Sequence, residues 1–380
     1  MNNDLLRRIG LSLAAPAAAA LFALTISAFV LEFSGSPAIE TYRIMLENGM
    51  KLETVVDALN RGTPLFLSGV AAAIGFRMNL FNIGVEGQYF LAAFTAAAVG
   101  AAVALPGVLH MLFIIFVAML VGALWSGLAG LLKVTRGVNE VISTIMLNYI
   151  AIGGIIAAVR PKVIADLTAT NQSTEVLPES AWLPDLNWLL ELFTREITKG
   201  RRLTGVFAIA VLVGIIYHVI INRSRLGYDI RASGMNPFAA RVGGVPPKRM
   251  ILIAMVSGGA IAGLVGMPEI LSNTHAYDQG FVPGLGFGGI AIALLGRNNA
   301  PGMAVAAILF GFLDSSSAIL QVSADASQSI VIIMQGTFLL AAVVAYEVVN
   351  RIRQRDEVAR ASRLTADAAP GGVTPAGGAA

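Results

Sequence analysis

Three polar residues in one apolar stretch fall on a single face of the helix that the stretch predicts. Glu140, Thr144 and Asn148 are spaced four residues apart, which places them one above the other along a helix. A polar stripe of this kind is typical of a translocation path through a membrane. Two other roles stay open: Glu140 suits the positive end of a helix dipole, and Asn148 suits a helix–helix hydrogen bond.

A second set of polar residues lies in the glycine-broken run before another apolar stretch. Asn82, Glu86 and Gln88 occur there, and Glu86 also suits a first-turn position at the end of a helix dipole. Gln335 lies deep in the last apolar stretch, where it serves either a polar path or a contact between helices. The substrate-path candidates are therefore Asn82, Glu86, Gln88, Glu140, Thr144, Asn148 and Gln335.

Residues suited to catalysis or metal binding do not form a pattern. The chain has no cysteine, and its three histidines, His110, His218 and His275, are too scattered for a metal-ligand motif. No Ser/His/Asp arrangement and no phosphate-binding GxxxxGK[ST] loop is present. We therefore expect no enzyme activity, no metal and no cofactor. A proton-coupled secondary carrier stays open as an alternative, because buried carboxylates can carry protons.

The composition indicates that these residues sit in a membrane. Of 380 residues, 56% are hydrophobic and 13% are charged, whereas soluble domains carry about 25% charged residues. The formal charge of +3 is too small to indicate a nucleic-acid partner, so we expect membrane lipid rather than nucleic acid around the chain.

The predicted fold class is all-α: a polytopic membrane protein with about ten transmembrane helices. A spanning helix needs about 20 apolar residues. An amphipathic helix on the membrane surface is expected over residues 39–60. The ten predicted spans cover residues 9–31, 63–80, 87–105, 108–132, 141–159, 204–221, 250–270, 287–295, 303–320 and 330–349.

The arginines and lysines predict that both termini are cytoplasmic. They concentrate in the loop 222–249 and in the tail 351–380, the end of which is rich in Ala, Gly and Pro and is expected to be disordered. The run Gly284 to Gly289 resembles the run around Gly84, about 200 residues and five spans earlier. An odd number of spans would invert the second copy, so the sequence predicts an inverted five-helix repeat.

The basic loop 222–249 contains a short predicted helix. Asn236 suits the N-cap, Pro237 the first turn and Gly243 the left-handed position after the helix. Such a helix could dock a soluble partner or rest on anionic headgroups. The docking residues would be Arg231, Asn236, Pro237, Ala240, Arg241 and Gly243.

Three motifs give the chain a resemblance to a known family. They are NLFNIGVEGQ at 79–88, GVNEVISTIMLNY at 137–149 and PGLGFGGIAIALLG at 283–296. With these motifs the chain resembles, over residues 63–345, the inner-membrane permease subunits of ATP-binding-cassette importers for simple sugars and nucleosides. The similarity is greatest to the longer of the two permeases that work with a binding lipoprotein of the basic-membrane-protein type.

This resemblance implies a permease domain over residues 1–350, with 222–249 as its cytoplasmic coupling loop, in the inner (plasma) membrane of a bacterium. It implies as partners a second, shorter permease subunit, a cytoplasmic ATPase with two fused cassettes and an extracytoplasmic substrate-binding protein. It also favours the docking role for the helix at Asn236–Gly243, and a nucleoside or a simple sugar as the substrate.

Overall fold

The computed structural model describes residues 21–164, 172–192, 201–323, 330–341, 344 and 351. Within them the structure is helical, with two isolated β-bridges. The prediction of an all-α fold is confirmed for these residues. Residues 1–20 lie outside the described part, and they include the start of the first predicted span, 9–31. Nearly all of the predicted tail 351–380 also lies outside it.

The chain divides into two compact units. One comprises Met1–Val30 and Ile332–Ala380, and within it Ala23 and Ala341 pack together with Phe338. The other is Leu31–Val331. Its helices are α2 (Ala38–Gly49), α3 (Leu52–Arg77), α4 (Val85–Ala101), α5 (Gly107–Arg136), α6 (Glu140–Tyr149), the π-helix η1 (Ile150–Ile156), α7 (Ala157–Val163), η2 (Glu179–Ala181), α8 (Asn187–Glu191), α9 (Val206–Arg223), α10 (Arg225–Met235), α11 (Pro237–Val242), α12 (Pro247–Gly263), the π-helix η3 (Glu269–Asn273), α13 (Leu285–Leu295) and α14 (Ala300–Ser323).

Several helices are suited to a bilayer by length and composition. Among the described residues, three are long and apolar enough to cross a membrane: α5, the continuous helix Glu140–Val163, and α9. The bent pair Leu21–Phe33 and Ala38–Gly49 adds a fourth if it forms one span. The chain is therefore a helical membrane protein, while the number of ten spans stays a prediction.

The predicted surface helix over 39–60 is wrong as a single element. The chain breaks at Met50 and Lys51, and α3 then runs without interruption from Leu52 to Arg77. Because α3 buries every residue from Thr63 to Gly75, it lies at the centre of its unit and contacts α9, α12, α13 and α14. Helix α3 thus begins eleven residues before the span that was predicted from residue 63.

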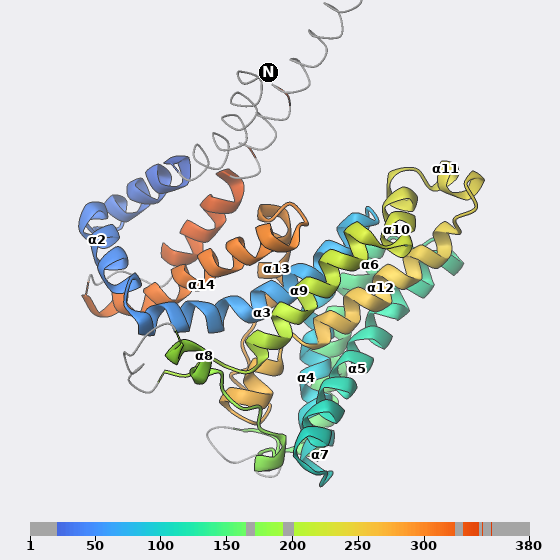
Figure 1. The fold of residues 1–380 in the computed structure, drawn as a ribbon, viewed down its shortest axis with the longest axis horizontal. Helices are drawn as coiled ribbons and strands as arrows, with labels where there is room; N and C mark the ends of the chain where they lie inside the picture. Colours follow the sequence, from blue (N-terminus) through green and yellow to red (C-terminus); the bar gives the residue numbers. More distant parts are fainter. Residues whose placement is uncertain are drawn as a thin grey trace, which may run out of the picture. The chain divides into compact units, whose positions relative to one another are not determined.

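Helices α5 and α12 lie side by side in Figure 1 and meet through small residues. A Cβ atom on Gly122 would lie 2.2 Å from the carbonyl oxygen of Gly259, and one on Gly259 would lie 2.3 Å from the carbonyl oxygen of Gly122. The opposite face of α5 exposes large apolar side chains, among them Leu112, Phe116 and Leu124. This division is typical of a helix that packs on a neighbour through glycine and faces lipid with its other side.

We expect Gly259→Val to force α5 and α12 apart, because the backbone atoms that the new side chain meets cannot move aside. Overpacking of this kind costs about 1–3 kcal/mol. The apparent melting temperature of the purified protein in detergent should fall. Gly153→Val is the matched control, since a Cβ at Gly153 has no atom within 4 Å; an equal effect of both substitutions would contradict the assignment.

Candidate functional site

Asparagine side chains bind the amide groups at the start of α4. Asn82 Oδ1 accepts a hydrogen bond from Gly84 N at 3.0 Å, and Asn148 Oδ1, from α6, accepts one from Gly87 N at 2.8 Å. Asn148 Nδ2 also donates to Ile83 O at 2.9 Å. Helix ends leave backbone groups unpaired, and a bilayer offers no water to bind them, so these side chains replace the missing partners.

Asn82 and Gln88 form an amide pair in the interior. Gln88 Nε2 lies 3.0 Å from Asn82 Oδ1, and Asn82 Nδ2 lies 3.3 Å from Gln88 Oε1. Both side chains are buried. Two of the predicted path residues therefore bind each other in this structure.

The carboxylate of Glu86 joins α4 to the start of α13. Glu86 Oε1 accepts from Gly284 N at 2.6 Å, and Oε2 accepts from Gly286 N at 2.8 Å. The Tyr89 hydroxyl shares its proton between Glu86 Oε1 at 3.1 Å and Val282 O at 2.7 Å. Only 6% of Glu86 is exposed. A buried carboxylate bound by backbone N–H groups at a helix N-terminus is a stabilising arrangement.

The backbone of α13 reaches Glu86 because residue 286 is a glycine. A Cβ atom there would lie 2.5 Å from Glu86 N and 2.8 Å from Glu86 Cα. Gly284, which precedes α13, has a φ of +89°, a conformation that side chains other than glycine rarely adopt. The two glycine-broken runs that the sequence analysis compared with each other are thus in direct contact.

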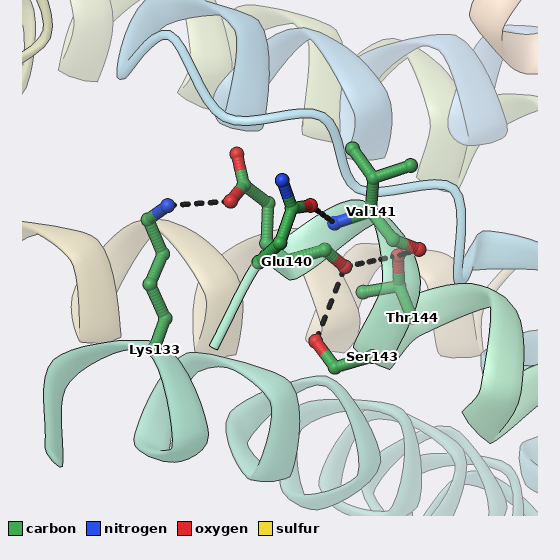
Figure 2. Close-up of polar contacts among 6 residues, drawn as sticks. Lys133, Glu140, Val141, Ser143 and Thr144 are labelled. Carbon is green, nitrogen blue, oxygen red and sulfur yellow. Dashed lines mark hydrogen bonds and ion pairs between the residues drawn. The ribbon is translucent and has the colours of Figure 1, made fainter. Parts of the chain in front are cut away.

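Figure 2 shows the first turns of α6, which carry Glu140 and Thr144 of the polar stripe. Glu140, at the first turn, forms an ion pair with Lys133 at the end of α5. The Thr144 hydroxyl donates to the carbonyl oxygen of Glu140 at 2.6 Å, and the Ser143 hydroxyl to the same oxygen at 3.2 Å. Asn139 caps the helix by accepting from Val141 N at 2.8 Å. Glu140 therefore has a cationic partner, Lys133, which the sequence analysis did not predict.

The structure brings five of the seven path candidates together. Asn82, Glu86 and Gln88 belong to the start of α4, Asn148 binds that turn, and Thr144 Cβ lies 3.0 Å from where a Cβ of Gly84 would be. Glu140 lies one helical turn from Thr144. Gln335 is half-buried and belongs to the other compact unit. Sequence reasoning missed Tyr89 and Lys133; the seven-residue spacing of Lys133 and Glu140 across Gly137 was the available signal for the ion pair.

The loop 222–249 contains the predicted short helix and one more. Helix α11 spans Pro237–Val242, as predicted, and Asn236 Oδ1 caps it by accepting from Phe238 N and Ala239 N, both at 3.0 Å. The prediction for Gly243 is wrong: its φ is −75°, and Gly244 takes the left-handed conformation with a φ of +83°. The loop forms its turn one residue later than the glycine pattern indicates.

Helix α10 (Arg225–Met235), which the sequence analysis missed, precedes α11 at one end of α9 and α12 (Figure 1). It carries Arg231, whose Nη1 is buried and has no hydrogen-bond partner among the residues that the structure describes. Ala240 is buried within α11, whereas Arg241 is exposed. Phe238 and Val242 are 76% and 77% exposed, so α11 presents large apolar side chains on its surface.

Burial shifts the pKa values of two rings in the connection to α13, His275 and Tyr277. His275 stacks on Trp182, with ring centroids 4.0 Å apart, and burial lowers the pKa of its imidazole. Burial raises the pKa of Tyr277 to about 12. Tyr277 packs with Phe90, Phe94 and Phe281 in an aromatic cluster over this connection. Neither ring therefore supplies charge beside the Glu86 joint.

Comparison with known proteins shows that the chain is similar to transport permeases. The family described as branched-chain amino acid transport system / permease component matches residues 54–343. The guanosine ABC transporter permease protein NupP of Bacillus subtilis is 34% identical, over 88% of this chain and 93% of its own length. The glucose ABC transporter permease protein TsgB13 of Haloferax volcanii is 28% identical, over 86% and 85%. The guanosine ABC transporter permease protein NupQ of B. subtilis is 26% identical, over 67% and 79%.

We expect Glu86→Gln to loosen the joint between α4 and α13. The amide offers one acceptor where the carboxylate offers two, and hydrogen bonds to a charged group are worth about 1.5–3 kcal/mol. The melting temperature should fall, and the amides of Gly284 and Gly286 should exchange hydrogen faster. The exposed Glu40→Gln is the control; unchanged exchange at both glycines in Glu86→Gln would show that the joint does not depend on the carboxylate.

Proposed function

We propose that this chain, which belongs to the family of branched-chain amino acid transport system permease components, imports a nucleoside as one permease subunit of an ATP-binding-cassette transporter. As a permease component it is not an enzyme. The observation that carries the choice of substrate is the 34% identity to a guanosine permease over 88% of the chain. A simple sugar is the second candidate, favoured by the similarity to the glucose permease protein over nearly the same length.

Family membership favours this function over a proton-coupled secondary carrier. The carrier would need carboxylates that are free to bind and release protons in the membrane. Glu86 is held by two backbone N–H groups and Glu140 by Lys133, so both carboxylates already have partners within the protein.

The proposed complex contains a second permease subunit. Two relatives from B. subtilis, NupP and NupQ, are both guanosine permease proteins, and this chain is more similar to the first. The other proposed partners are a cytoplasmic ATPase with two cassettes, which would supply the energy, and an extracytoplasmic substrate-binding protein. We place the complex in the inner membrane of a bacterium.

The proposed topology has ten spans, both termini in the cytoplasm and an inverted repeat of five helices. Support comes from the two glycine-preceded helices α4 and α13, which begin after Gly84 and Gly284. The permease domain would cover residues 1–350 and the cytoplasmic tail residues 351–380. In this topology the loop 222–249, with α10 and α11, faces the cytoplasm.

The proposed translocation path passes the polar cluster at the start of α4. Asn82, Gln88 and Asn148 bind one another or nearby backbone groups, so their contribution would be to hold the path in shape. Thr144 and Glu140 continue the cluster toward one end of α6, and Gln335 is the further proposed path residue. The proposed coupling residues are Arg231, Asn236, Pro237, Ala240, Arg241 and Gly243.

Uptake of labelled guanosine by the complete transporter in liposomes tests the substrate and the energy source together. We expect uptake that requires ATP on the ATPase side, is inhibited by an excess of unlabelled nucleosides and is unaffected by excess glucose. Inhibition by glucose alone would instead favour the sugar. Uptake driven by a proton gradient in liposomes that hold only this chain would contradict the importer.

The exposed apolar side chains of α11 provide a test of coupling. Phe238→Ala removes a ring that is 76% exposed, so the fold should be retained while an aromatic contact to the ATPase is lost. We expect less ATPase to co-purify and uptake to fall in parallel. Phe33→Ala is the matched control, because Phe33 is also exposed and lies far from this loop in the sequence. Undiminished co-purification and uptake in Phe238→Ala would remove the docking role from α11.

A further inference from the structure

An apolar groove lies along α9 between α3 and α14. Its volume is about 410 Å³, and it is lined almost wholly by apolar side chains. Phe207 and His218 mark its two ends on α9, and Phe66 of α3 meets the small Gly214 at its middle. Ala304 of α14 lines the third side. The groove belongs entirely to the compact unit Leu31–Val331.

The dimensions of the groove suit one hydrocarbon chain. From Phe207 to His218 is eleven residues, or about 16 Å along a helix. This is close to half of the roughly 30 Å hydrocarbon thickness, which is the depth of one leaflet. A methylene group fills about the volume of one water molecule in the liquid, roughly 30 Å³. A cavity of about 410 Å³ therefore accommodates most of one acyl chain.

The end of the groove at Phe207 is closed by polar backbone contacts. Asn60 Nδ2, on α3, donates to Arg202 O at 2.7 Å, and Asn60 Oδ1 accepts from Thr204 N at 3.0 Å. Asn60 follows Leu59, which lines the groove. These bonds hold the segment that leads into α9 against α3, directly beside the groove.

Cationic side chains surround this end. Arg201 lies 3.4 Å from Asp57 and Arg202 lies 3.7 Å from Asp185, and their side chains are 58% and 76% exposed. Arg61 is exposed and forms no ion pair within the described part of the chain. Asp57, one helical turn before Arg61, interacts electrostatically with both Arg61 and Arg201, and Glu53 lies one turn further along α3. Among the described residues, this end of the groove thus carries the guanidinium groups of Arg61, Arg201 and Arg202, with Asp57 and Asp185 as the carboxylates in ion pairs with them.

We propose that this groove binds one acyl chain of an anionic phospholipid, with the headgroup phosphate at Arg61 and Arg202. A guanidinium group can donate two parallel hydrogen bonds to two oxygens of one phosphate. The apolar walls bury the hydrocarbon chain without removing water from any polar group. In the proposed topology this end faces the outer leaflet. The binding is independent of which solute the transporter carries.

A transmembrane helix of the second permease is the competing occupant. A helix is about 10 Å across with its side chains, and at most a row of its side chains would enter a groove of this volume. Arg61, which forms no ion pair within the described part of the chain, would also have no counterpart in that arrangement, whereas a phosphate would bind it. The length, the volume and the charge of the site together favour the lipid.

Native mass spectrometry of the complete transporter, released from nanodiscs of phosphatidylglycerol and phosphatidylcholine, measures the bound lipid. We expect the wild type to retain phosphatidylglycerol in preference to phosphatidylcholine. Ala304→Phe places a ring inside the groove and should remove one retained lipid. Ile215→Trp is a second filling variant, chosen because Ile215 lines the groove and is 58% exposed, so the larger ring need not enter the core.

Leu212→Phe is the matched control, because Leu212 is exposed on α9 and does not line the groove; it should leave the lipid count unchanged. Arg61→Gln should abolish the preference for phosphatidylglycerol while the fold is retained. Equal retention of both lipids by the wild type would overturn the anionic headgroup. Unchanged lipid in both filling variants, with loss of the second permease from the complex, would assign the groove to a partner helix instead.

Discussion

The centre of this protein depends on the hydrogen bonds between the Glu86 carboxylate of α4 and the backbone amides at the start of α13. An ionised carboxylate in an apolar interior is costly unless hydrogen bonds compensate for the lost water. Here the amides of Gly284 and Gly286 provide two such bonds, at 2.6 and 2.8 Å, and the positive end of α13 adds a favourable field. Separating α4 from α13 would leave the charge without these partners. The two helices therefore behave as one element.

The same requirement explains the other polar residues around this joint. Both α4 and α13 start after a glycine within an apolar region, and each start leaves amide groups that water cannot reach. Asn148 of α6 accepts a hydrogen bond from an amide at the start of α4, and Glu86 of α4 accepts one from an amide at the start of α13. A chain of caps thus runs from α6 through α4 to α13. Polar side chains are energetically costly in a bilayer, but here they fix the positions of α4, α6 and α13 relative to one another.

Local features of the fold were predictable because their causes are local. The Asn236 cap and the first-turn proline are enough to specify α11, and four-residue spacing is enough to place Thr144 and Asn148 on one face. The partner of Glu86 was not predictable, because it is a backbone amide some 200 residues away that no side-chain pattern marks. The start of α3 at Leu52 was missed for a similar reason: tertiary packing, not apolar content, extends that helix.

The joint also limits where movement can occur during transport. Opening a path between α4 and α13 would break charge-assisted hydrogen bonds that no water in the bilayer replaces. By contrast, α11 is six residues long, is followed by Gly244 in a left-handed turn and exposes Phe238 and Val242. A partner that binds there contacts a small element connected to α9 and α12 through α10 and the turn. In the proposed coupling role, a partner bound at α11 would act on α9 and α12, which pack on α3, and this route does not require the hydrogen bonds of the α4–α13 joint to break.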